Sequence, residues 1–65
     1  MRIPHQQAAD AFIIDLSTRM PIADVRQIVE VAEALALRSG DTELTRLHLK
    51  AILGYLRFVG EKASE

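Results

Sequence analysis

The sequence has 65 residues, enough for one domain, and a domain of this size buries only about 60% of the surface of its unfolded chain. Eight Lys and Arg against nine Asp and Glu residues give a formal net charge of -1, which excludes an overall electrostatic attraction to nucleic acid. Cysteine is absent, which excludes a disulfide framework and a thiolate metal site. We therefore expect residues 1–65 to form a single domain stabilised by apolar packing, to which association between chains could contribute.

Hydrophobic residues make up 49% of the chain and aromatic residues only 5%, a composition rich in Ala, Leu, Ile and Val. Such a composition favours packed helices. No apolar run approaches the ~20 residues that span a bilayer, and the first residues do not resemble a signal peptide. We expect a soluble cytoplasmic protein without membrane contact.

The first predicted helix covers residues 6–18. Pro4 favours an extended backbone before it, and apolar side chains then recur at helical spacing. His5 is expected to be solvated or to stand at the helix start. The predicted buried stripe consists of Ala9, Phe12, Ile13, Leu16 and Met20, and Ile14 lies off it.

The second predicted helix covers residues 21–38. Pro21 is suited to a first helical turn, and Gly40 follows the end as a C-cap glycine would. Leu37 projects from the polar side and has no obvious partner within the chain. Apolar residues cover about half of the circumference: Ile22, Val25, Ile28, Val29, Val31, Ala32, Leu35 and Ala36.

The third predicted helix covers residues 45–60, with Thr45 or Thr42 as its N-cap. Its apolar side chains surround most of the helical wheel. Gly54 costs about 1 kcal/mol relative to Ala inside a helix, so it either permits close backbone approach or marks a bend. A β-strand over residues 53–59 is the competing interpretation, because Tyr, Phe and Val favour strands, but no second strand is predicted to pair with it.

Residue types that could carry catalysis are few and scattered. His48 is expected to be a partly buried or interfacial histidine hydrogen-bonded to a neighbour, because no second ligand at metal-binding spacing accompanies it. Carboxylates such as Glu30 and Glu33 are assigned to solvent-exposed helix faces, and no glycine-rich phosphate loop is present. We predict no enzyme activity, no catalytic residues, no metal site and no cofactor.

One patterned charge feature is a basic strip on the third helix, formed by Arg46, Lys50 and Arg57. It could lie along phosphates, pair with an acidic partner, or be the solvated side of a buried helix. Glu30 and Glu33 on the second helix would repel phosphate, which disfavours a helix-turn-helix interpretation of residues 11–38.

Apolar side chains exceed what three short helices can cover. The surplus predicts an interface with a second copy of the chain about a two-fold axis, or with another protein. The residues predicted to bind the partner are Leu37, Leu47, Leu49, Tyr55, Leu56 and Phe58.

Residues 21–45, followed by residues 47–53, resemble the small helical lid domain of AAA+ ATPases, whose helices are similar to those of histone folds. The resemblance covers residues 9–56 and implies a helix, a turn, a second helix and a threonine-capped third helix. The nucleotide-binding domain of that family is missing, and no arginine here can be assigned its sensor role. The resemblance therefore implies a fold and carries over no functional residues.

The sequence thus predicts an all-α, three-helix bundle completed by oligomerisation. The predicted function is a non-enzymatic protein–protein interaction module or regulator that acts through apolar residues of helices two and three, as a homodimer. The alternative is a small DNA-binding transcriptional regulator that uses the basic strip.

Overall fold

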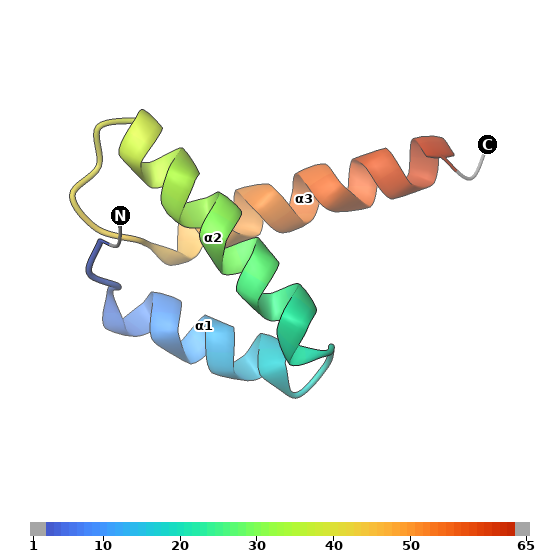
Figure 1. Ribbon diagram of the computed structural model, residues 1–65, viewed down its shortest axis with the longest axis horizontal. Coiled ribbons are helices and arrows are strands. Elements are labelled where there is room, and N and C mark those ends of the chain that lie inside the picture. Colours follow the sequence, from blue (N-terminus) through green and yellow to red (C-terminus); the bar gives the residue numbers. More distant parts are fainter. Residues whose placement is uncertain (1–2, 64–65) are drawn as a thin grey trace.

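A computed structural model describes the backbone of residues 3–63 and the side chains of residues 3–57, 59 and 60. It contains three helices, α1 (Gln7–Ser17), α2 (Ile22–Arg38) and α3 (Arg46–Ala63) (Figure 1). The predicted all-α, three-helix arrangement is confirmed, and α3 continues three residues beyond its predicted end. Residues 53–59 are helical, so the strand interpretation is wrong.

Helix α1 ends where the predicted break lies. The side chains of Ser17 and Thr18 donate hydrogen bonds to carbonyl oxygens of the last turn, Ile13 O at 2.9 Å and Asp15 O at 2.7 Å. Pro21 is the N-cap of α2, with a ψ of 145°, so it stands one residue before the first helical turn in which it was expected.

Helix α2 ends in a Schellman motif centred on Gly40. This glycine has a φ of 79°, in the left-handed region that side chains with a Cβ disfavour. The N–H of Asp41 donates to Ala36 O at 2.9 Å, and the N–H of Gly40 donates to Leu37 O at 3.1 Å. The predicted C-cap role of Gly40 is confirmed.

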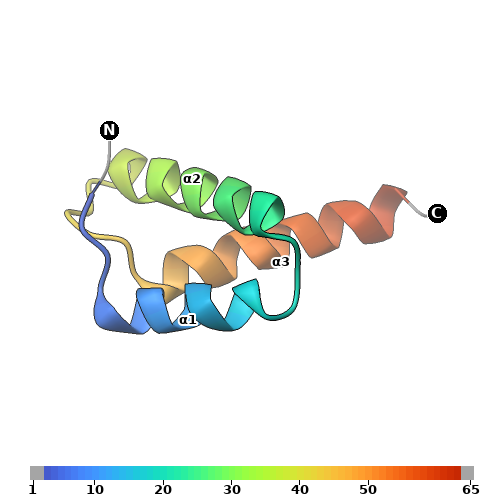
Figure 2. The same cartoon turned by 60° about the horizontal axis from the view of Figure 1, so that its bottom comes forward.

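Residues 3–6, which precede α1, form a strap that pairs with the loop between α2 and α3. His5 and Leu44 make an isolated parallel bridge, in which Leu44 N–H donates to Pro4 O at 2.8 Å and Gln6 N–H donates to Leu44 O at 2.9 Å. Figure 2 shows this N-terminal segment running beside the loop that connects α2 to α3. The strap thus closes the bundle next to the start of α3.

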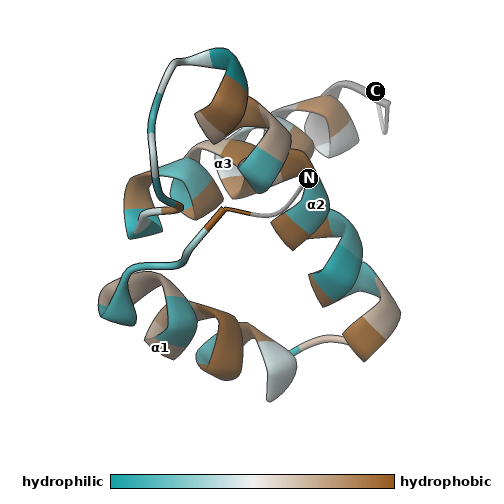
Figure 3. Ribbon diagram, turned by 60° about the vertical axis from the view of Figure 1, so that its left-hand side comes forward, coloured by the Kyte–Doolittle hydropathy of each residue, from teal (hydrophilic) through white to brown (hydrophobic). Residues whose placement is uncertain are grey.

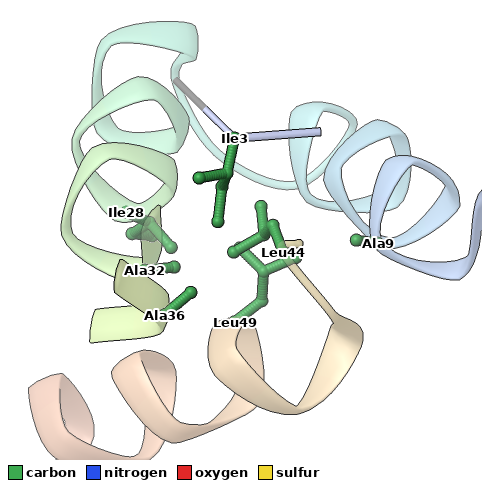
Figure 4. Close-up of a cluster of buried hydrophobic side chains, with 7 residues drawn as sticks. All are labelled: Ile3, Ala9, Ile28, Ala32, Ala36, Leu44 and Leu49. Carbon is green, nitrogen blue, oxygen red and sulfur yellow. The ribbon is translucent and has the colours of Figure 1, made fainter. Parts of the chain in front are cut away.

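The core lies between the strap, α1, α2 and the first half of α3. Figure 3 shows hydrophobic and hydrophilic segments alternating along the helices, as in amphipathic helices that share one core. The strap contributes Ile3 to the core and the loop before α3 contributes Leu44. Neither lies on a predicted helical stripe. The cluster consists of Ile3, Ala9, Ile28, Ala32, Ala36, Leu44 and Leu49 (Figure 4).

Two sequence-based assignments need correction. Glu33 was assigned to a solvent-exposed face but is buried, with 9% of its surface exposed, because His5 covers it from the strap. His5 itself stands at the helix start, directly before the N-cap of α1, as one of its two expected positions, and is half-buried. Leu49 was assigned to a partner-binding surface but has no exposed area, because α2 and the strap enclose it in the core.

Helix α3 extends beyond the ends of α1 and α2 in two views (Figures 1 and 2). No described side chain after Leu53 in α3 is buried. We call residues 54–63 the α3 arm. The arm leaves the bundle with apolar side chains that the chain itself does not cover.

Candidate interaction surface

An open groove lies between α2 and α3 at the foot of the arm. It encloses about 690 Å³. We call it the α2–α3 groove. Its apolar lining residues are Met20, Ile28, Val31, Ile52, Leu53, Tyr55 and Leu56, and its polar lining residues are Asp24, Gln27 and Arg57.

Helical spacing explains why these side chains meet in the groove. Asp24, Gln27 and Val31 stand at positions i, i+3 and i+7 of α2, which share one face, and Ile52 and Leu56 stand four apart on α3. Ile28, Ile52 and Leu53 also pack against the core, so they form the floor. The groove is therefore a direct continuation of the hydrophobic core to the surface.

The arm adds exposed apolar area beside the groove. Tyr55 is 65% exposed, and Leu56 and Val59 have between two fifths and half of their surface exposed. Val31 is exposed to a similar extent on the α2 side. Contiguous apolar surface of this kind is typical of binding sites.

The six predicted partner-binding residues do not form one surface. Tyr55 and Leu56 line the α2–α3 groove, whereas Leu47, 75% exposed, lies outside the groove near the start of α3. Leu49 is in the core, and the side chain of Phe58 lies outside the described residues.

Leu37 lines a second groove, which encloses about 850 Å³ between α1 and α2. Charged side chains contribute much of its lining, among them Asp10, Arg26 and Glu30. Ile22 lines the same groove and is largely exposed. This surface is more polar than the α2–α3 groove and is a weaker candidate for an apolar partner.

The three cations of the predicted basic strip have different surroundings. Arg46 places its guanidinium carbon 5.7 Å from the ring centroid of Phe12, which is cation–π geometry. Arg57 lines the α2–α3 groove, and Lys50 is exposed. Arg46 therefore helps to dock α3 on α1.

Both histidines serve as connectors between elements. His48 accepts a hydrogen bond at Nδ1 from the N–H of Thr45 at 3.0 Å, and its Nε2 lies 2.7 Å from Asp41 Oδ2. His5 lies between two carboxylates, with Nδ1 3.1 Å from Asp10 Oδ1 and Nε2 3.3 Å from Glu33 Oε2. The expectation that His48 is partly buried and bonded to a neighbour is confirmed.

The predicted partner-binding residues leave out Met20 and Val31, which line the α2–α3 groove, and Val59, which is exposed on the adjoining arm. The sequence places Met20 on the stripe of the first helix, Val31 in the apolar arc of the second and Val59 on the apolar wheel of the third. A signal was present in α2, whose apolar arc is wider than the stripe that one neighbouring helix can cover. Only the angle between α2 and α3 determines which part of that arc stays open.

In the described part of the chain, no helix is long and apolar enough to cross a membrane, and no three His, Asp or Glu side chains gather as a metal site. Comparison with known proteins found no matching family model, no similar curated protein and no similar solved structure.

Proposed function

We propose that this chain is a non-enzymatic protein–protein interaction module that acts through the α2–α3 groove and the adjoining side chains of the α3 arm, as a homodimer. One observation carries the proposal. The hydrophobic core opens to the surface at a groove whose side chains continue onto a projecting helix with exposed Tyr55, Leu56 and Val59.

The size of the chain supports the same function. A domain of 65 residues has little core to spare, and a second copy would cover apolar surface that the first leaves exposed. Two-fold self-complementary interfaces are the commonest way for soluble chains to do this. The resemblance to AAA+ lid domains stays a hypothesis about the fold and adds no residue to the proposed surface.

Sedimentation equilibrium over a range of concentrations tests this proposal. Wild type should be heavier than the 7.2 kDa of one chain at micromolar concentration. Leu56→Ser should raise the dissociation constant by about tenfold or more, because it removes an apolar side chain from the centre of the surface. Ile22→Ser, an equally drastic change at an exposed residue of the second groove, between α1 and α2, is the matched control and should leave association unchanged.

A wild-type chain that stays monomeric at high micromolar concentration would contradict the homodimer. Equal effects of the two substitutions would place the interface elsewhere.

DNA binding through Arg46, Lys50 and Arg57 is a second candidate. One observation favours it: every charged residue within residues 46–60 is basic. Phosphate contacts by Lys and Arg make affinity fall steeply with salt. DNA affinity that is salt-independent, or that survives Lys50→Glu, would exclude this candidate.

A further inference from the structure

We infer that the homodimer is reciprocal: the α3 arm of each copy lies in the α2–α3 groove of the other. The inference rests on the proposed function and specifies its geometry. The rival geometry packs the outward faces of the two α3 helices, around Leu47 and Ala51, against each other.

Charge distribution favours the reciprocal geometry. Helix α2 carries three acidic and two basic side chains, a net of -1, whereas residues 46–60 carry three basic and no acidic side chains, a net of +3. Two α3 helices packed through Leu47 and Ala51 would bring Arg46 and Lys50 of both copies together, and like charges disfavour association. In the reciprocal geometry, Arg57 of each arm instead approaches the α2 side of the other copy's groove, where Asp24 lies.

The dimensions of arm and groove also agree. From Asp24 to Val31 the α2 side of the groove runs two helical turns, about 10 Å at 1.5 Å per residue. The two turns of the arm from Gly54 to Gly60 cover about the same length. Leu56 belongs to both groove and arm, so it lies near the two-fold axis, and Val59 one turn further reaches Val31 of the other copy.

The exposed apolar area supplies most of what such a dimer requires. Val31, Tyr55, Leu56 and Val59 together expose roughly 400 Å² in each copy, hence about 800 Å² in the pair before floor and rim are included. Specific interfaces begin at about 1,000 Å² in total. The four side chains thus supply most of a minimal interface, and reciprocal packing buries all of them at once.

Cross-linking of single-cysteine variants tests this geometry, since the wild-type chain has no cysteine. Val31→Cys chains are mixed with Val59→Cys chains and treated with a short bismaleimide. A cross-link then reports contact between different molecules. Ala51→Cys alone reports contact between outward α3 faces.

We expect the mixture to give about tenfold more covalent dimer than Ala51→Cys, because cross-linking needs closely spaced Cβ atoms. Urea-denatured samples measure the collisional background. Preferential cross-linking of Ala51→Cys in a protein that sediments as a dimer would overturn the reciprocal geometry and leave the proposed function standing. A monomer in sedimentation would overturn both.

Discussion

At the scale of single residues, His48 determines how α3 begins. A backbone N–H can only donate, so the contact from Thr45 N–H requires a lone pair on Nδ1 and places the proton of the neutral ring on Nε2, where it is donated to Asp41. His48 is the third residue of α3, the position from which Glu or Gln reaches back in a capping box. The imidazole takes over that role and also anchors the preceding loop.

Replacing His48 separates these contributions. His48→Ala should lower the free energy of unfolding by about 1 kcal/mol, because it leaves a helix-start N–H without its acceptor. His48→Gln retains a hydrogen-bond acceptor at the third helical position, so its free energy of unfolding should fall clearly less. Urea denaturation followed by circular dichroism measures both, and equal losses would mean that the bond to Thr45 contributes nothing.

His5 and Glu33 form the second residue-scale connection, between the strap and α2. Removing His5 leaves a buried carboxylate without this partner, which costs about 1–3 kcal/mol. In a double-mutant cycle, His5→Ala and Glu33→Ala each lower the free energy of unfolding. The double variant should lose about 1 kcal/mol less than the sum of the two single losses.

Asp10→Ala is the control for this cycle. Asp10 contacts the other ring nitrogen of His5 but is exposed, and exposed ion pairs contribute little. Additive losses for His5 and Glu33 would show that their contact at 3.3 Å has no energetic weight.

At the scale of helices, two glycines have opposite roles. Gly40 adopts the left-handed conformation that ends α2, whereas Gly54 lies inside α3, and a Cβ added there would meet nothing within 4 Å. The expectation that Gly54 allows close backbone approach therefore finds no support within a single chain.

Alanine at each glycine should thus change stability in opposite directions. Gly54→Ala should raise the free energy of unfolding by about 1 kcal/mol, because Ala loses less backbone entropy in a helix. Gly40→Ala should lower it by about 1 kcal/mol through strain at positive φ. Thermal unfolding at low protein concentration measures both without a contribution from association, and a destabilising Gly54→Ala would point to a packing role for Gly54.

At the scale of the whole molecule, the strap and the arm divide the chain into a closed and an open end. Ile3 and Leu44 are buried where the strap pairs with the loop before α3, so this end is finished within one chain. The other end exposes the α2–α3 groove and the arm. The molecule is thus closed by the strap at one end and exposes apolar side chains at the other.

Stability should consequently depend on protein concentration. For a dimer that dissociates on unfolding, a tenfold rise in protein concentration adds about 1.4 kcal/mol per dimer to the stability of the folded state. The midpoint temperature of unfolding should therefore rise by several degrees. Scanning calorimetry at several concentrations measures the shift. Leu56→Ser should shift upward, by about tenfold or more, the concentration range over which the midpoint rises, whereas a concentration-independent midpoint in wild type would argue against a dimer.

Local signals accounted for the three helices because each signal acts within a few residues. Pro21 and Gly40 restrict the backbone at the helix boundaries, and the stripe from Ala9 to Leu16 follows the helical repeat. The strap was not predicted because residues 3–6 form their bonds with Leu44, about forty positions away. No local pattern encodes a pairing over that distance.

The amino-acid sequence by itself determined an all-α domain with three helices, their boundaries to within three residues and an excess of apolar side chains, since these follow from backbone propensity and periodicity. Only the tertiary structure decided which of those side chains remain exposed. The angle between α2 and α3 and the closure of the strap placed Leu49 in the core, covered Glu33 with His5, and separated Leu37 from Tyr55 and Leu56. Burial depends on which elements pack together, and that is a property of the assembled fold.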